Sequence, residues 1–250
     1  MASVIERAVT ILKLLIPQGG IKEWGASEIA YRSGIPVGTV HRILLELKKH
    51  GLVAQNDVTK KFRLGLLLME LGFIARENLS IMETAKPVLK NLMEKTKETA
   101  HLTIQDGYEG VLIDKIETMY ELRTVQPIGM RTPLTRGALK KAILAFLPSD
   151  EINDIIEKHE KAKNRPQIMS ELEDIRLKGY AISFGEVTCG TAAIATPVFD
   201  FQGKVVASIG IMGPATRFTQ EEIPQKIKYV MEAGALLTKN IRGHDRVKRN

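Results

Sequence analysis

The side chains best suited to recognition chemistry stand together at the start of one predicted helix. Five neighbouring residues are small, hydroxylic or able to donate hydrogen bonds: Val37, Gly38, Thr39, His41 and Arg42. Small residues let a helix approach another surface closely, and threonine and arginine can hydrogen-bond to the edges of bases. This set is typical of a helix that enters the major groove of DNA.

Neighbouring elements must hold that helix in place. The segment from Gly25 to Gly65 predicts two short helices around a tight turn, followed by a two-stranded hairpin. This is the pattern of a winged helix-turn-helix. Residues three and four positions apart share one face of a helix, so Arg42 lies opposite the face that packs. The predicted packing face consists of Val40, Ile43, Leu44 and Leu47.

The hairpin and the charge distribution point the same way. Lys60, Lys61 and Arg63 lie at or beside the predicted hairpin tip, where basic side chains suit phosphate groups. Residues 1–65 carry a net charge of +5, and the rest of the chain carries +2. A helical pair with a hairpin also occurs in protein-interaction domains, but this concentration of positive charge favours DNA.

Two further helices flank this segment. Ser3 and Glu6 have the spacing of a capping box at the start of the first helix. Its expected buried stripe is Val4, Ala8, Leu12 and Leu15.

After the hairpin, the sequence predicts an apolar helix that breaks near residues 78–80, and Pro87 is expected to end or kink the helix that follows. Either the rest of its own domain or a second copy of the chain must cover the apolar helix. Self-pairing would place two DNA-reading segments side by side, as a palindromic operator requires.

The composition is that of a globular protein with room for two domains. The chain has 250 residues, of which 44% are hydrophobic and 26% charged, and no apolar run approaches the roughly 18 residues of a membrane span. It shows no signal peptide, and we expect a cytoplasmic protein. A single cysteine cannot form an internal disulfide, and the five scattered histidines lack metal-site spacing. We therefore expect no metal and no cofactor.

The C-terminal half changes from a helical to a two-residue period at Thr99. Strands are expected on both sides of a turn at residues 106–110, with residues 121–126 as a possible third strand. Two or three helices follow, then three strands within residues 180–213, and a last helix over residues 219–241. Strands that follow strands directly, with helices inserted midway, predict an α+β domain with an antiparallel sheet.

Four segments together resemble the IclR family of bacterial transcription regulators. They are the Gly25 to Gly65 segment, KPVLKNLMEKTKETAHLTI, GMRTPLTRGALKKAILAFLP and KGYAISFGEVTCGTAAIATPVFDFQGKVVASIGIMGP. The resemblance covers nearly the whole chain in the family's order. It implies a winged helix-turn-helix at residues 1–65, a linker helix at 66–80 and a GAF-like effector-binding domain with flanking helices at 81–250. It also implies a dimer or a tetramer built as a dimer of dimers, and an operator upstream of a catabolic operon.

The resemblance also implies an effector pocket between the sheet and its crossing helices and loops. The matching positions are Gly129, Met130, Leu134, Ala138, Ser183, Ala193, Gly210 and Met212. Family members that bind small organic acids carry several polar side chains at the strand positions, whereas this chain has only Ser183 there. The loop also departs from the family pattern, because it reads Gly137 to Lys141 as GALKK.

This lining favours an aromatic or bulky effector over a two- or three-carbon acid. A buried carboxylate without hydrogen-bond donors is costly, so a small acid would need compensation from backbone amides or a lysine. The expected function is a repressor whose affinity for DNA changes when the effector binds.

An enzyme or an interaction scaffold with a docking head remains the alternative. Cys189 is the only thiol, but the sequence places no histidine base near it. His101 on a predicted strand is expected to be a core or edge residue and not a metal ligand. The sequence therefore offers no catalytic residue.

Overall fold

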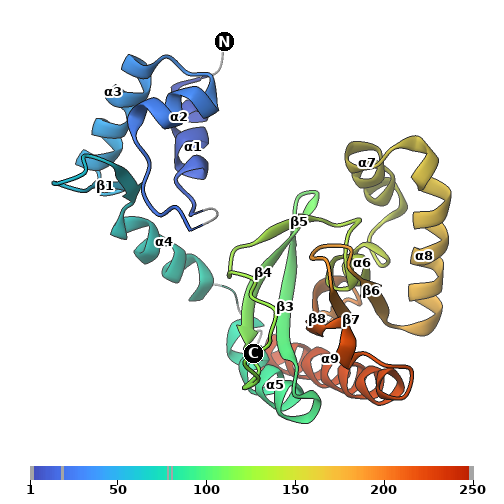
Figure 1. Cartoon of the computed structure of the whole chain (residues 1–250). Helices are drawn as coiled ribbons and strands as arrows, with labels where there is room; N and C mark the ends of the chain where they lie inside the picture. Colours follow the sequence, from blue (N-terminus) through green and yellow to red (C-terminus); the bar gives the residue numbers. More distant parts are fainter. Residues whose placement is uncertain (1–2, 18–19, 78, 80, 248–250) are drawn as a thin grey trace. The chain divides into compact units, whose positions relative to one another are not determined.

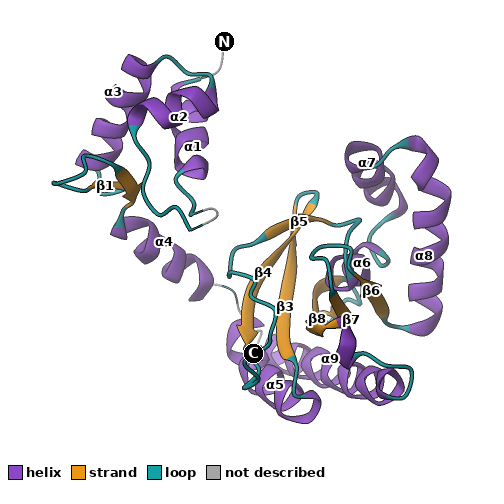
Figure 2. Ribbon diagram, in the orientation of Figure 1, coloured by secondary structure: helices purple, strands orange, loops and turns teal. Residues whose placement is uncertain are grey.

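The structure is a computed structural model that describes residues 3–17, 20–77, 79 and 81–247. The chain folds into two compact units, residues 1–79 and residues 80–250. Figure 1 labels the helices and strands of both units, and Figure 2 colours them by type.

The first unit is helical with a small hairpin. Its elements are α1 (Val4–Leu14), α2 (Ala26–Ser33), α3 (Val37–Lys49), β1 (Val53–Gln55), β2 (Phe62–Leu64) and α4 (Leu66–Glu77). The two strands pair antiparallel, and Trp24 adds an isolated bridge to Phe62 of β2. The predicted winged helix-turn-helix is confirmed.

The core of this unit follows the predicted periodicity except in α1, where Ala8 and Leu12 are only partly buried and the fully buried Ile11 was not predicted. Ser3 and Glu6 form the predicted capping box at the start of α1. The stripe of α1 that packs runs through Ile11 and Leu15, both fully buried. The expected burial of Val4 is wrong, since its side chain is 66% exposed. Val4 lies on the same stripe, but one turn before the core begins.

The second unit is built on a six-stranded antiparallel sheet with the strand order β5-β4-β3-β8-β7-β6. Its elements are α5 (Ile81–Thr96), β3 (Thr99–Asp106), β4 (Glu109–Ile116), β5 (Arg131–Pro133), α6 (Ala138–Leu144), α7 (Ser149–His159), α8 (Arg165–Lys178), β6 (Ala181–Phe184), β7 (Thr191–Phe199), β8 (Val205–Pro214) and α9 (Glu222–Val247), with 3-10 turns at Ala162–Asn164 and Ala215–Arg217. The predicted α+β class is confirmed.

Helices cover both faces of the sheet (Figure 1). α5 and α9 pack on each other and on one face; a Cβ atom at Gly234 of α9 would lie only 2.3 Å from Cγ2 of Thr196 on β7. α6 lies on the opposite face, where the Ser208 hydroxyl of β8 donates a hydrogen bond of 2.6 Å to the Leu139 carbonyl. All seven residues of α6 are buried, so this short helix lies in the interior of the unit.

The predicted third strand of this unit is wrong. The third strand is β5 and not residues 121–126, because Arg131 and Thr132 pair with β4 at Val111 and Gly110. The preceding residues form a loop, in which the Thr118 amide donates to the Thr99 hydroxyl.

Pro87 does not end α5. A proline inside a helix removes one backbone hydrogen bond and crowds the preceding turn. α5 nevertheless continues to Thr96, because Ala85, Val88, Leu89 and Leu92 bury an apolar face that compensates for this cost.

Candidate nucleic-acid interface and ligand site

The first half of α3 forms an exposed surface on the first unit. Val40, Ile43, Leu44 and Leu47 are buried as predicted, which leaves the other face of α3 open. The structure places Thr39 half-buried and the other four predicted base-reading residues at the surface: Val37, Gly38, His41 and Arg42. Leu45, which the sequence analysis did not select, extends this face by one turn and is also exposed.

The turn between α2 and α3 fixes the start of that surface. Gly34 ends α2 in the left-handed region with φ of +69°, a conformation that glycine adopts without strain. The Ser33 hydroxyl then accepts a hydrogen bond of 3.2 Å from the Ile35 amide. At the other end of α2, the Glu28 carboxylate accepts a hydrogen bond of 2.6 Å from the Gly25 amide, which lowers the pKa of Glu28.

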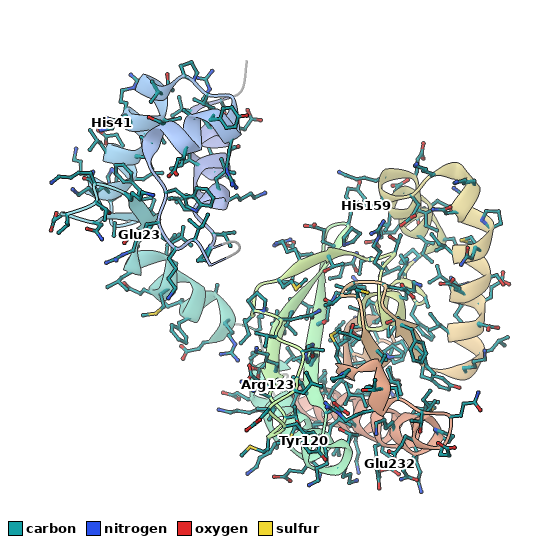
Figure 3. All side chains as sticks on the ribbon, viewed as in Figure 1. Glu23, His41, Tyr120, Arg123, His159 and Glu232 are labelled. Atoms are coloured by element: carbon teal, nitrogen blue, oxygen red, sulfur yellow. The ribbon has the colours of Figure 1, made fainter. Side chains whose placement is uncertain are left out.

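Glu23 anchors the hairpin turn and was not selected from the sequence. Its carboxylate accepts hydrogen bonds from the Asn56 side-chain amide at 3.1 and 3.2 Å and from the Thr59 hydroxyl at 3.2 Å. These bonds, with that from Asn56 the strongest, hold the pKa of Glu23 below its usual value. Figure 3 labels Glu23 beside the hairpin and His41 on α3. The sequence feature that could have identified Glu23 is its position next to Trp24, which forms a bridge with Phe62 of β2.

The predicted phosphate contacts differ in their partners. Arg63 pairs with Glu23 at 3.2 Å, and Lys61 lies 3.7 Å from Glu28, so nearby carboxylates partly neutralise both cations. Lys60 occupies the left-handed region with φ of 58° and is exposed, and it forms no ion pair with any residue in the described part of the chain. His41 also has a packing partner, because its ring stands edge-on to Phe62 at 6.5 Å.

The predicted effector residues do not all meet in one place in the second unit. Leu134, Ala138, Ala193 and Met212 belong to one apolar core cluster that includes α6 itself. Gly129 and Met130 instead lie at the sheet edge, where the Gly129 amide donates to the Leu112 carbonyl and the Met130 carbonyl accepts from the Leu112 amide.

The two remaining positions have structural roles as well. Ser183 faces Ala193 across the β6–β7 pair, and its hydroxyl accepts a hydrogen bond of 2.9 Å from the Ala138 amide at the start of α6. Gly210 packs against the backbone of β7, since a Cβ atom there would lie 2.3 Å from the Ile194 carbonyl oxygen. A larger residue at Gly210 would push the two strands apart.

Two open cavities lie beside α6 and α8, and charged residues contribute to the lining of both. Their volumes are about 330 and 340 Å³, and both are lined by Lys141, Glu171 and Glu186. Of the eight predicted effector residues, only Ser183 reaches either cavity. The first cavity also has apolar walls from Ile175, Ile182 and Phe184, but the charged residues of both cavities differ from the lining that the sequence predicts.

Lys141 ties these cavities together. Its ammonium lies 2.6 Å from Glu171 and 2.8 Å from Glu186, and Glu186 also accepts a hydrogen bond of 2.9 Å from the Gly137 amide. Burial works to lower the pKa of Lys141, but the hydrogen bonds to the two carboxylates raise it above its usual value. The lysine is therefore a structural cation held by two acids.

Lys140, the next residue, is the site's least expected feature. Its side chain is only 2% exposed, and burial lowers its pKa to about 8. The departure of the GALKK loop from the family pattern was the sequence signal for this residue, but it did not reveal the burial.

His101 and Cys189 are the remaining candidates from the sequence. His101 is 1% exposed, as expected for a core residue; burial is the main cause that lowers its pKa to about 3, and the charges of Lys140 and Lys115 lower it further. Cys189 is exposed. The described residues contain no group of three or more ligands that could hold a metal ion. In the same part of the chain, no helix is both long and apolar enough to cross a membrane.

Both units match descriptions of one protein family. Residues 4–57 match the "IclR helix-turn-helix domain", and residues 74–237 match "Bacterial transcriptional regulator IclR C-terminal". The second match alone covers more than half of the chain.

Individual proteins agree with this assignment. The HTH-type transcriptional regulator KdgR of Escherichia coli is 32% identical over 248 residues, which cover 96% of this chain and 94% of KdgR. KipR of Bacillus subtilis is 32% identical over 222 residues, or 86% of this chain and 88% of KipR. The HTH-type transcriptional repressor AllR of Klebsiella pneumoniae is 31% identical over 238 residues, or 92% and 87% of the two chains.

Solved structures share the fold. The crystal structure of Thermotoga maritima IclR superposes with a TM-score of 0.72 at 29% identity and covers 95% of this chain and 98% of that chain. An IclR regulator from Alicyclobacillus acidocaldarius gives a TM-score of 0.81 at 23% identity, covering 96% and 98%.

Proposed function

The chain belongs to the IclR family of bacterial transcriptional regulators, and we propose that it is a repressor of a neighbouring catabolic operon. It is a DNA-binding regulator and not an enzyme. We assign residues 1–65 to the DNA-binding domain, 66–80 to the linker helix and 81–250 to the effector-binding domain. We also assign the protein to the cytoplasm, where its operator would be.

The observation that carries this proposal is the exposed first half of α3 beside a hairpin. We assign base contacts to the exposed donors and small residues of α3, because only side chains that project from the helix can reach base edges in the major groove. We assign phosphate contacts to the basic residues of the hairpin. The proposed DNA-binding residues are Val37, Gly38, Thr39, His41, Arg42, Lys60, Lys61 and Arg63.

The linker helix supports self-association. None of the described residues of α4 is buried; five of its large apolar side chains are at least half exposed, whereas Leu67 and Leu68 are partly buried. Exposed apolar patches of this kind mark protein interfaces. We propose that a second copy of the chain covers α4, giving a dimer or a tetramer on a palindromic operator. The exposed apolar residues of α4 are Leu66, Met69, Leu71, Phe73 and Ile74.

The second unit would bind a small organic effector. The apolar cluster that includes α6 supports an aromatic or bulky molecule, because it offers carbon surface and few hydrogen-bond donors. The proposed effector-binding residues are Gly129, Met130, Leu134, Ala138, Ser183, Ala193, Gly210 and Met212. Effector binding would change DNA affinity only if the effector prefers one arrangement of the two paired DNA-binding domains. DNA must then alter effector affinity by the same factor.

Substitution of Arg42 tests the DNA-reading surface. Binding of the full-length protein to the DNA upstream of the neighbouring operon is measured by fluorescence anisotropy. Arg42→Ala should weaken specific binding by about 1–3 kcal/mol, which is roughly 5- to 150-fold, and leave binding to unrelated DNA much less affected. Lys204→Ala, in an exposed turn of the other unit, is the control and should bind like wild type. Unchanged specific binding by Arg42→Ala would show that the recognition surface is assigned to the wrong residues.

A further inference from the structure

A set of buried polar side chains lies between α6 and the β5-β4-β3 half of the sheet. We call Lys140, His101, Thr103 and Thr132 the Lys140 cluster. Each of these four residues is less than one-tenth exposed. Both ring nitrogens of His101 and the hydroxyl oxygens of Thr103 and Thr132 are buried without a hydrogen-bond partner among the described residues.

Gly110 of β4 brings three of these residues together. A Cβ atom at Gly110 would lie 2.7 Å from Cγ of Lys140 and 3.1 Å from Cγ2 of Thr103. The stem of Lys140 therefore rests on the strand directly at Gly110, next to Thr103. Thr132 stands opposite Gly110 in the β4–β5 pair, so its side chain lies on the same face.

His101 belongs to the same face of β3. It precedes Thr103 by two residues, and side chains two apart on a strand point to the same side. Thr103 faces Ser208 across the β3–β8 pair, and the Ser208 hydroxyl bonds to Leu139 of α6. These contacts place the face that carries His101 and Thr103 beneath α6. Leu139, which Ser208 contacts, is the residue directly before Lys140 in the chain.

The charge of the cluster is positive and uncompensated. Lys141 has Glu171 and Glu186 as partners, whereas Lys140 forms no ion pair with a carboxylate in the described part of the chain. Lys115, which faces His101 across the β3–β4 pair, is already paired with Glu117 at 2.7 Å. The neighbouring acid is therefore engaged elsewhere.

Such a cluster is costly unless something binds to it. A buried polar group without a hydrogen bond destabilises a protein by about 1–3 kcal/mol, and nearly all buried polar groups in folded proteins are paired. Here Thr103 and Thr132 lie around Gly110 with the stem of Lys140, and His101 lies two residues from Thr103 on the same face of β3. A convergent set of one cation, two hydroxyls and one imidazole matches a ligand with a negative group and further hydrogen-bonding atoms.

We propose that the Lys140 cluster binds the anionic end of the effector: a carboxylate on Lys140, and hydroxyl or carbonyl groups of the same molecule on Thr103, Thr132 and His101. The inference rests on the proposed effector-binding role of this unit. It narrows the effector class, because the bulky molecule must carry a carboxylate and further polar groups. The lysine supplies the positive charge that a buried carboxylate needs.

Isothermal titration of the full-length protein with two matched pairs of probes tests this assignment. The probes are 4-hydroxybenzoate and gluconate, each with its neutral primary amide. At least one acid should bind, and its amide should bind about 10- to 100-fold more weakly, as expected when a charge-assisted hydrogen bond is lost. If neither acid binds, or if the amides bind equally well, the assignment is wrong.

Protein variants show where on the protein the acid binds. Lys140→Met keeps the length of the side chain but removes its charge and should weaken binding of the acid by about 10- to 100-fold. Thr103→Val keeps the side-chain shape, so it should fold and weaken binding by about 3- to 10-fold. Lys204→Met, an exposed control, should bind like wild type. Unchanged affinity in both Lys140→Met and Thr103→Val would overturn the proposal.

Operator binding, measured in parallel without any probe, distinguishes a failure of the proposed function from a failure of the Lys140 cluster assignment. Wild type and the Lys140→Met variant should both bind operator DNA, because the Lys140 cluster lies entirely in the second unit. If the wild-type protein fails to bind DNA, the proposed function fails. If the wild-type protein binds DNA but the probe affinities differ from those expected above, only the assignment of the cluster fails.

Discussion

The candidate functional residues of the two units carry positive charge in opposite ways. In the first unit, Arg42, Lys60 and Arg63 are exposed, whereas in the second unit Lys140 and Lys141 are 2% and 6% exposed. DNA presents its phosphates on the outside of a rod, so a protein meets them with side chains that project. A small ligand can be surrounded, and a buried cation interacts with it more strongly. Net charge therefore identified the DNA-binding unit but not the buried lysine that we propose binds the effector.

Buried and surface ion pairs provide a second contrast. Arg63 and Glu23 pair at the surface of the first unit. In the second unit, Arg217 forms two hydrogen bonds of 2.7 Å to the Glu98 carboxylate, whose side chain is 1% exposed. Surface pairs contribute little to stability, while loss of one member of a buried pair leaves an unpaired charge in the interior.

The largest expected effect tests this contrast directly. Glu98→Gln should lower the free energy of unfolding by about 3 kcal/mol, because Arg217 would lose its counter-charge. The measurement is urea denaturation followed by circular dichroism. Glu232→Gln, in an exposed pair with Lys95, is the control and should change stability by less than about 1 kcal/mol. Equal effects of the two substitutions would break the contrast between buried and surface pairs.

A second prediction concerns the pH dependence of Lys140. The fall of its pKa from 10.5 to about 8 means that folding disfavours the charged form, by about 3 kcal/mol at pH 7. Lys140→Met should therefore be more stable than wild type at pH 7. Because the folded protein releases the proton first, wild type gains stability as the pH rises from 8 to 10.5, and the advantage of the variant should shrink over that range. Denaturation of both proteins at pH 7 and pH 10 gives the difference, and an advantage that stays constant with pH would contradict the assignment.

A third prediction separates the basic residues of the hairpin. Lys61→Ala and Lys60→Ala should each weaken binding to all DNA sequences about equally. Each should also reduce the slope of log affinity against log salt concentration by about 1. The loss should be larger for Lys60, because Glu28 lies beside Lys61 and partly neutralises it already. Anisotropy titrations across salt concentrations measure the slopes. A larger loss for Lys61 would show that its pairing with Glu28 is broken on DNA.

The smallest expected effect is at Cys189. This residue is exposed and lies outside both the DNA-reading surface and the Lys140 cluster. Cys189→Ser should leave operator affinity and the response to a bound acid unchanged, since the substitution alters one surface atom. A lost ligand response, with DNA binding intact, would assign a role to the thiol.

Sequence reasoning worked best where the determining contacts are local. The exposed face of α3 follows from the spacing of Val40, Ile43, Leu44 and Leu47, and the capping box of α1 follows from two residues three apart. It failed where distant segments decide the outcome. β5 is selected by its pairing with β4, and Pro87 remains helical because α5 packs on the sheet and α9.

The amino-acid sequence by itself determined the family, the α+β class and the face of α3 that is free to meet DNA. These depend on the order of segments along the chain and on the 3.6-residue period of a helix, which any reader of the sequence can measure. Only the tertiary structure decided what the adjacent residues Lys140 and Lys141 do. α6 crosses the sheet, so Lys141 reaches Glu171 and Glu186 while Lys140 is buried over Gly110 beside Thr103. Burial and pairing depend on residues that are far away in the chain, and neither is encoded in local spacing.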